Sequence, residues 1–253
     1  NANMLANEMF LDSAALRSSV VSHAKTLGYE VSSPRAPIAT VNVSLSTTAS
    51  TKTMPAGTAF TTSVDGTSFQ FVTVSDITSN STGSSIPFDS INIYEGSYVT
   101  TRYTADTSDV DQRFLLSDAR SDTTTLKVKV QNSASDSTTT TYTKATDITQ
   151  LSASSTVYFL QETDSGLFEI YFGDGTVSRA LSDGNIVILQ YVVTNKTASN
   201  GATVFGSPSS IDGVTGVTTT TVTSAIGGSE SESIQSIKLN APLDYAAQGR
   251  CVT

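Results

Sequence analysis

Over most of the chain, hydrophobic and polar residues alternate with a period of two, which is the pattern of β-strands that bury one face. In the run ATVNVSLS, Val41, Val43 and Leu45 fall on one face and polar residues fall on the other. The run TLKVKV at residues 125–130 has the same form, with lysines on its polar face. The run NIVILQYVV at residues 185–193 is hydrophobic on both faces, which predicts a central strand that is covered on both sides.

Short turn motifs separate these runs. Asp65-Gly66 lies between two alternating runs and suits a type I′ hairpin turn. Residues 164–166 join a second pair of predicted strands, and Glu95-Gly96 is predicted to form a turn or a bulge. Because consecutive strands are joined by tight turns, we expect antiparallel sheets.

The first segment of the chain has helical spacing instead. Asp12 can cap the start of this helix, and Gly28 can supply a left-handed residue at its end. The apolar positions step by three or four residues, at Leu16, Val20, Ala24 and Leu27.

The end of the chain is also predicted to be helical, after a threonine-rich strand near residues 214–224. Ser229 and Glu232 have the spacing of a capping box. Pro242 is expected to limit the helix, because proline cannot donate a backbone hydrogen bond. The helix has one apolar face, formed by Ile234, Ile237 and Ala241.

These patterns predict a mainly β (α+β) fold with antiparallel β-sheet domains, terminal helices and no nucleotide-binding fold. We expect a first β domain made of two separated stretches, with a second β domain inserted between them. The expected parts are a helical segment at 1–37, the first β domain at 38–98 with 201–226, the inserted domain at 99–200, and a helical segment at 227–253. We also expect the chain to be part of a longer polypeptide.

Composition and charge narrow the possible partners. The chain has 253 residues, of which 38% are hydrophobic, so it can build a core. Its formal net charge of −9 argues against binding to nucleic acid or to an anionic membrane, since both require clustered lysine and arginine. A single cysteine, Cys251, excludes a disulfide within the chain and suits folding in a reducing cytosol.

Two groups of carboxylates could suggest catalysis or metal binding. Asp106, Asp109 and Asp111 lie close together, but they lack the glycine and the final glutamate of an EF-hand loop, so we expect a solvated loop. Glu162 and Glu169 flank a turn and could imitate a glycosidase pair, but Glu162 is as readily a solvent-face residue as Glu169. We therefore expect no enzyme activity, no catalytic residues, no cofactor and no metal.

Two further motifs have simple structural interpretations. His23 has no second histidine and no nearby cysteine, so we expect it to be solvated or locally hydrogen-bonded. The glycines of the FGDG stretch at residues 172–175 suit a tight turn that needs no ligand.

Several stretches in a fixed order resemble the baseplate J-like family of contractile phage tails, and within it the wedge proteins of T-even-type baseplates. The longest similar stretch, residues 157–194, begins VYFLQETDSGLFEIYFGDG. The others are a helix with a Leu-Gly-Tyr end at 23–37, a first hairpin at 54–71, a Glu-Gly turn at 94–100 and a closing helix at 227–253.

The resemblance implies a structural role in the virion. Members of the family form the baseplate wedge, associate with other copies and with other wedge and hub proteins, and close a ring around the tail hub. That ring rearranges when the tail contracts, so a subunit would act as a hinge. The resemblance therefore places the protein in the tail baseplate, after assembly in the host cytoplasm, and supplies no catalytic residues.

The terminal helices carry more large apolar side chains than a small helix needs. We therefore predict that they form a protein interface with another copy or another wedge protein; the alternative is that they pack on their own β domain. The predicted interface residues are Met4, Leu5, Met9, Phe10, Ile234, Ile237, Leu239, Leu243 and Tyr245. An alternative function is a receptor- or glycan-binding adhesin or tail-fibre module, which would show glycan affinity.

Overall fold

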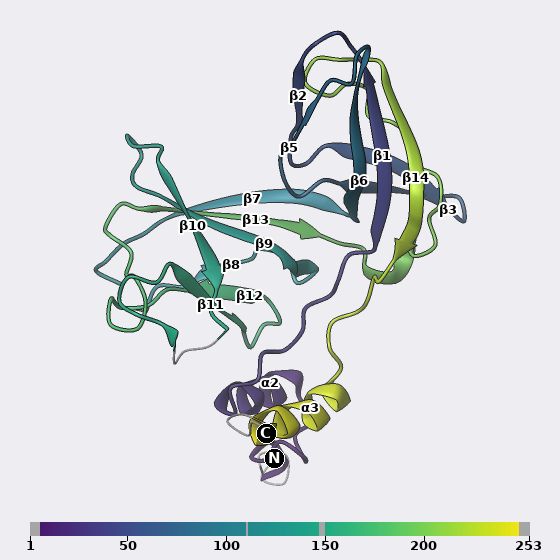
Figure 1. Ribbon diagram of the computed structural model, residues 1–253. Helices are drawn as coiled ribbons and strands as arrows, with labels where there is room; N and C mark the ends of the chain where they lie inside the picture. The colour runs from purple at the N-terminus through teal and green to yellow at the C-terminus, as the bar shows by residue number, and fades with distance from the viewer. Residues whose placement is uncertain (1–5, 110, 147–149, 248–253) are drawn as a thin grey trace, which may run out of the picture.

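The computed structural model describes residues 6–109, 111–146 and 150–247. It contains two large β-sheets and a pair of packed helices (Figure 1). We call these parts the first β unit, which holds a five-stranded sheet, the second β unit, which holds a seven-stranded sheet, and the helical unit. The predicted mainly β fold with helices near both ends of the chain is confirmed.

The first β unit is built from an antiparallel five-stranded sheet and a two-stranded ribbon. The sheet order is β14-β1-β6-β4-β3, and β2 pairs with β5 in the ribbon. The bounds are β1 Ile38–Ser46, β2 Thr51–Met54, β3 Ala59–Val64, β4 Thr67–Val72, β5 Ile77–Asn80, β6 Ser85–Glu95 and β14 Val217–Ile226.

The second β unit is a seven-stranded sheet with the order β7-β13-β9-β10-β11-β12-β8. Its bounds are β7 Ser97–Thr104, β8 Phe114–Leu115, β9 Ser121–Gln131, β10 Thr139–Lys144, β11 Val157–Glu162, β12 Phe168–Tyr171 and β13 Ile186–Val193. A short 3-10 helix, η2 (Lys196–Ser199), follows β13. One pair departs from the expected antiparallel arrangement, because β10 and β11 are parallel. No tight turn joins these two strands, and a parallel pair needs a longer connection.

Each β unit has its own hydrophobic core. In β1, Val41, Val43 and Leu45 are buried, as their alternation predicts. In β13, Val187 and Leu189 enter the core of the second β unit, while Val192 on the other face packs in a separate cluster with Ala36 and Val72. The prediction that this strand is covered on both sides is therefore confirmed. Each such buried aliphatic side chain contributes roughly 1.5–3 kcal/mol.

The helical unit consists of α2 (Arg17–Thr26) packed against α3 (Ile234–Ala247). After α2, Gly28 has φ +79°, and two backbone bonds close the helix in a Schellman motif. In these bonds Tyr29 N–H donates to the Ala24 carbonyl and Gly28 N–H to the Lys25 carbonyl, each over 3.0 Å. The predicted glycine C-cap is confirmed. The shared core comprises Ala14, Val20, Val21, Ala24, Val31, Ile237 and Ala241.

The predicted cap at the start of α2 is wrong. The N-cap residue is Leu16, which makes no side-chain capping bond, so Asp12 lies too early in the chain. Glu8 replaces the missing cap, because its carboxylate accepts the N–H of Ala15 at 2.9 Å and that of Leu16 at 3.3 Å. The chain before α2 thus folds back to satisfy the first donors of the helix.

Two expectations for α3 also need correction. Ser233 caps this helix, because its hydroxyl accepts the N–H of Ser236 at 3.1 Å, whereas Ser229 pairs with Arg35. Pro242 lies inside the helix and does not end it. Pro242 is exposed, and its missing N–H removes the usual intrahelical donor to the Lys238 carbonyl. Neither α2 nor α3, in the described part of the chain, is long and apolar enough to span a membrane.

The chain passes between the units in a nested order, from the helical unit to the first β unit, to the second, and back again. The predicted hairpin at Asp65-Gly66 is confirmed, with φ of +49° and +80° at its two residues. Glu95-Gly96 does not form a hairpin turn, because it carries the chain from β6 in one sheet to β7 in the other. Residues 30–37 and 227–233 form the connection to the helical unit, which we call the neck (Figure 1).

Candidate functional site

The helical unit exposes large apolar side chains that its own core does not cover. The core uses one face of α3, so the residues on its other faces point away from α2. Leu239 and Leu243 lie four residues apart and are therefore neighbours on the helix surface. The exposed fraction lies between 59% and 68% for Met9, Phe10, Leu239, Leu243 and Tyr245.

The structure divides the predicted interface residues into three groups. Ile237 is fully buried against the helical unit's own core, and Ile234 packs against the same core. These two isoleucines join α3 to α2, so neither offers a free surface in this conformation. Met4 and Leu5 lie outside the described residues. The remaining five side chains form the exposed apolar set given above, and their role in an interface stays a prediction.

The neck brings together two segments far apart in the sequence. Arg35 and Ser229 exchange two backbone hydrogen bonds, of 3.0 and 3.1 Å, which form an isolated antiparallel bridge. Gly228 is packed so closely that an added Cβ would lie 2.4 Å from Pro37 Cγ. Glycine at this position is therefore required by the close approach of the two segments.

A partly buried ion pair connects the helical unit to the second β unit. The Arg17 guanidinium donates to both carboxylate oxygens of Glu162, over 2.7 and 2.8 Å, and also to the Glu232 carbonyl. Glu162 is buried, so the expectation that it lies on the solvent face as readily as Glu169 is wrong. Glu169 accepts a hydrogen bond from the Gln161 side-chain amide. Both carboxylates of the suspected glycosidase pair are thus occupied by structural contacts.

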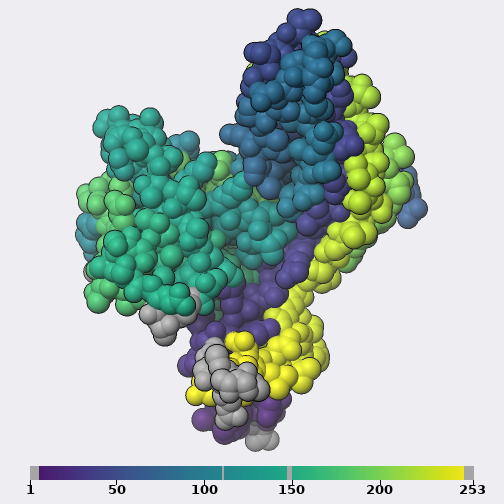
Figure 2. Space-filling model, viewed as in Figure 1, coloured from purple at the N-terminus to yellow at the C-terminus, as the bar shows by residue number. Residues whose placement is uncertain are grey.

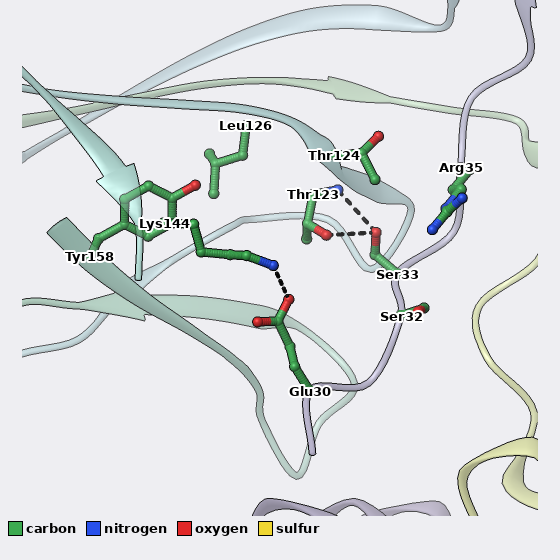
Figure 3. Close-up of a pocket in the computed structure, with 9 residues that line it drawn as sticks. All are labelled: Glu30, Ser32, Ser33, Arg35, Thr123, Thr124, Leu126, Lys144 and Tyr158. Carbon is green, nitrogen blue, oxygen red and sulfur yellow. Dashed lines mark hydrogen bonds and ion pairs between the residues drawn. The ribbon is translucent and has the colours of Figure 1, made fainter. Parts of the chain in front are cut away.

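A cavity of about 530 Å³ lies between the neck and the second β unit (Figure 3). Lys144 and Glu30 form an ion pair of 2.8 Å across it, and the hydroxyls of Ser33 and Thr123 are 2.9 Å apart. Burial, together with the nearby Glu30 carboxylate, raises the pKa of Tyr158 to about 12, so this phenol stays neutral. The lining of the cavity is thus largely polar, and the ion pair and the hydroxyl contact link the neck to the second β unit.

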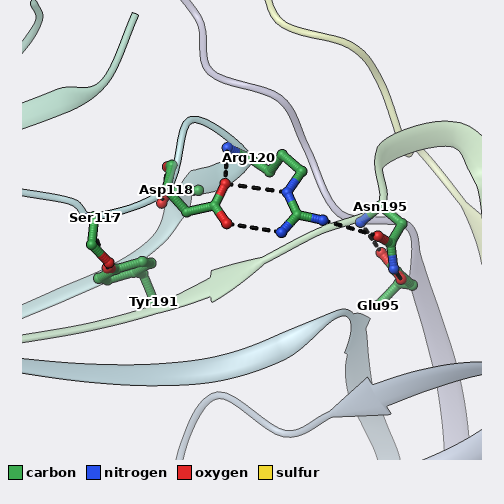
Figure 4. Close-up of polar contacts among 7 residues, drawn as sticks. Glu95, Ser117, Asp118, Arg120, Tyr191 and Asn195 are labelled. Atoms are coloured by element: carbon green, nitrogen blue, oxygen red, sulfur yellow. Dashed lines mark hydrogen bonds and ion pairs between the residues drawn. The ribbon is translucent and has the colours of Figure 1, made fainter. Parts of the chain in front are cut away.

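A second polar network joins the two β units (Figure 4). The buried Glu95 carboxylate accepts the Thr194 hydroxyl at 2.7 Å, and the backbone N–H and side-chain amide of Asn195 at 2.8 Å each. Arg120 forms a 2.8 Å ion pair with Asp118, and its side-chain hydrogen bond to that carboxylate lowers the pKa of Asp118. Arg120 also donates to the Asn195 side chain over 3.4 Å, which extends the network to the surface.

No local pattern in the sequence predicts these polar pairs. Arg17 and Glu162 are 145 positions apart, and Glu95 and Asn195 are 100 apart. Only tertiary folding brings such partners together. A glutamate at the end of a hydrophobic strand, as at Glu95, is the one local hint of a buried acceptor, because glutamate is rarely buried without partners.

The remaining motifs form local structure. Asp106 accepts the N–H and the hydroxyl of Ser108, and these bonds lower the pKa of Asp106. In the part of the chain that the structure describes, no three acidic, histidine or cysteine side chains are arranged to hold a metal ion. Of the two expectations for His23, a hydrogen bond is observed, since its Nε2 lies 2.8 Å from the carbonyl of Glu8, 15 positions earlier. Asp174 accepts the Thr176 N–H at 2.9 Å, which forms the expected turn in FGDG.

Comparison with known proteins indicates what the chain is similar to. Residues 100–217, which include nearly all of the second β unit, match the family described as bacteriophage baseplate wedge protein gp6, third domain. The chain is 26% identical over 283 aligned residues to the baseplate wedge protein gp6 of Enterobacteria phage T4. This alignment covers 99% of the chain and 41% of the T4 protein, so the chain spans about two fifths of that relative's length. Both matches confirm the resemblance to T4-like baseplate wedge proteins.

Proposed function

We propose that this chain, given its similarity to T4-like baseplate wedge proteins, is a structural subunit of a phage tail baseplate wedge. In this proposal the subunit lies in the tail baseplate of the virion and is assembled in the host cytoplasm. It associates with other copies into a ring around the central hub and contacts other wedge and hub proteins. The two β units act as stiff blocks, and the helical unit provides the association surface.

The observation that carries the proposal is the exposed apolar set of the helical unit. Isolated exposed apolar residues are common, but a concentration of five large ones on a two-helix unit is typical of an interface. Met9 and Phe10 come from the chain before α2, whereas Leu239, Leu243 and Tyr245 come from α3. The helical unit projects from one end of the molecule, where a partner can reach it (Figure 2).

The neck supports a hinge role during baseplate rearrangement. Its two segments are joined by few backbone contacts, the bridge of Arg35 with Ser229 and one hydrogen bond of 3.0 Å from Glu232 N–H to the Ser32 carbonyl. The helical unit and the neck contact the second β unit mainly through polar groups, which include the exposed pair of Glu30 and Lys144, worth about 0–1 kcal/mol, and the stronger pair of Arg17 with Glu162. Rotation about the neck would break these contacts and leave all three cores intact.

Sedimentation of the purified chain tests the association surface. The variant Leu239→Glu/Leu243→Glu places two carboxylates on the exposed face of α3, and we expect it to weaken self-association by at least about tenfold. Val204→Glu is the matched control, because Val204 is also exposed but lies in the first β unit. Unchanged association of the α3 variant, or equal effects of both changes, would contradict the proposal.

The alternative function, a receptor- or glycan-binding module, makes a different prediction. Saturable binding to a glycan array by the wild-type chain would favour it. Several large aromatic residues that could line a sugar-binding groove are buried in the cores, including Phe114, Phe168 and Tyr191. No described contact therefore favours this alternative over the structural role.

A further inference from the structure

Residues 201–206 cover part of each edge of the five-stranded sheet. At one edge, β3 is covered, because Gly206 N–H donates to the Thr61 carbonyl at 2.7 Å and Val204 accepts the Thr62 hydroxyl. At the other edge, β14 pairs with β1 alone among the described strands. Figure 1 shows β14 alongside β1 in the first β unit.

The open part of this edge can be located residue by residue. Ser46 N–H bonds to the Gly216 carbonyl, and the register of β1 with β14 is regular from Val217 to Thr221. Hydrogen-bonded and non-bonded pairs alternate in an antiparallel ladder, so the backbone groups of Thr219 and Thr221 face outward. The far end is covered, where Ala225 exchanges backbone bonds with residues 201–202, and at the near end Val217 N–H donates to the Thr215 carbonyl.

This edge lacks the devices that usually prevent strand pairing. Exposed edges are commonly protected by lysine, proline or inward-pointing charge. The strand sequence VTTTTVTSAI has none of these residues. The nearest charges in the sequence, Asp212 and Glu230, are each paired with a lysine of the same chain. A chain with a net charge of −9 thus presents one long uncharged edge.

We propose that β14 is a self-association surface, which pairs antiparallel with β14 of a second copy to form one continuous sheet. Two copies of an acidic chain repel each other, and this uncharged edge lets them meet without like charges along the contact. A two-fold axis at Thr221 would place Thr221 opposite its own copy and Thr219 opposite Thr223, and such cross-strand threonine pairs hydrogen-bond favourably. Exposed Val222 and Ile226 add apolar area beside the strand.

This surface lies on the first β unit and is distinct from the exposed apolar set of the helical unit. The proposal therefore does not depend on the association surface proposed above. The two can be separated by working in the Leu239→Glu/Leu243→Glu background, where contacts through α3 are weakened. In that background we expect a remaining dimer by sedimentation equilibrium, and slower hydrogen exchange of the Thr219 and Thr221 amides as concentration rises.

Two changes at Thr221 test the edge itself. Thr221→Pro removes an outward N–H, and Thr221→Lys places like charges near each other across the two-fold axis while leaving the backbone donor in place. We expect each to weaken the remaining dimer by at least about tenfold. Thr107→Lys is the matched control, because Thr107 is exposed in a loop of the second β unit. A monomeric background chain, or a dimer unaffected by Thr221→Lys, would overturn the proposal.

Discussion

The Glu95 carboxylate accepts two hydrogen bonds of 2.8 Å from Asn195, one from its backbone N–H and one from its side-chain amide. Glu95 is the last residue of β6, and Asn195 lies just after β13, so the chain's exit from the first β unit and its return are clasped together. A fully buried carboxylate needs such donors, because an unpaired buried charge is very costly. This contact fixes how the second β unit is attached.

Glu95→Gln should destabilise the protein by about 1–3 kcal/mol. The variant keeps the shape of the side chain, but it replaces one acceptor oxygen with an amide that faces donors of Thr194 and Asn195. Urea unfolding followed by circular dichroism measures the change. Glu230→Gln is the control, since Glu230 is exposed in a surface ion pair and should change stability by less than about 1 kcal/mol. Equal effects of the two variants would show that Glu95 is not a specific clasp.

Gly96→Ala should cost more stability than the same change at Gly66. Both glycines have positive φ, of +125° and +80°, so alanine is strained at either position. At Gly66 an added Cβ meets nothing within 4 Å, whereas at Gly96 it would lie 2.2 Å from the Val193 carbonyl oxygen. We expect about 1–2 kcal/mol at Gly66 and at least about 3 kcal/mol at Gly96, measured by thermal unfolding. Similar losses at both sites would mean that the backbone at Gly96 relaxes freely.

Local patterns in the sequence predicted the elements that depend on near neighbours. The alternation around Val43 identifies β1, and Asp65-Gly66 identifies a hairpin turn, because both signals come from backbone and burial preferences within a few residues. The Glu95-Gly96 pair has the same local appearance as a turn, yet it connects two sheets. Which sheet a strand joins depends on distant partners, so no local signal could have distinguished these cases.

The candidate site was predicted only in part for the same reason. The excess of large apolar residues in the terminal helix predicts that Leu239 and Leu243 form an interface, and the structure leaves both exposed. Ile237 is also a large aliphatic residue of the same helix, but it is covered by α2, which lies more than 200 residues earlier in the chain. The polar contacts of Arg17 and Glu162 join residues whose pairing follows from tertiary packing alone.

Breaking the ion pair of Arg17 with Glu162 from one side should be more damaging than removing both charges. Arg17→Met leaves the buried Glu162 carboxylate unpaired and should cost about 2–4 kcal/mol, somewhat less than for a fully buried pair because Arg17 is partly exposed. Adding Glu162→Gln should recover part of this loss. Urea unfolding of both variants measures the recovery, and Lys144→Met, at an exposed pair, is the control with an expected cost under about 1 kcal/mol. A double variant that is less stable than Arg17→Met would rule out this account.

Glu232 should make the contact between the neck and the helical unit sensitive to acid. Burial of this carboxyl raises its pKa, but hydrogen bonds from the Ser236 hydroxyl, the Ser32 N–H and the Tyr29 hydroxyl outweigh burial, so the pKa of Glu232 is lowered overall from 4.5. The pKa of Tyr29, in contrast, is raised to about 12 by burial and by its bond to Glu232, so the Tyr29 hydroxyl stays protonated and remains the donor. As the pH falls, the unfolded chain binds the proton on residue 232 before the folded chain does. The stability that ionised Glu232 contributes is therefore fully present above pH 4.5 and is lost as the pH falls through the lowered pKa of Glu232 in the folded chain.

Glu232→Gln tests this dependence, because the amide keeps the side-chain shape and cannot titrate. At neutral pH we expect the variant to be less stable than the wild type by about 1 kcal/mol, since hydrogen bonds to a charged acceptor become bonds to a neutral one. The difference should shrink as the pH falls below 4.5, where the wild-type carboxyl takes up its proton. Thermal unfolding over a pH series measures it, and the other carboxylates cancel because they are common to both proteins. A difference that stays constant across the series would mean that the carboxylate of Glu232 contributes no charge-dependent stability, and that the neck is held by uncharged contacts such as the bridge of Arg35 with Ser229.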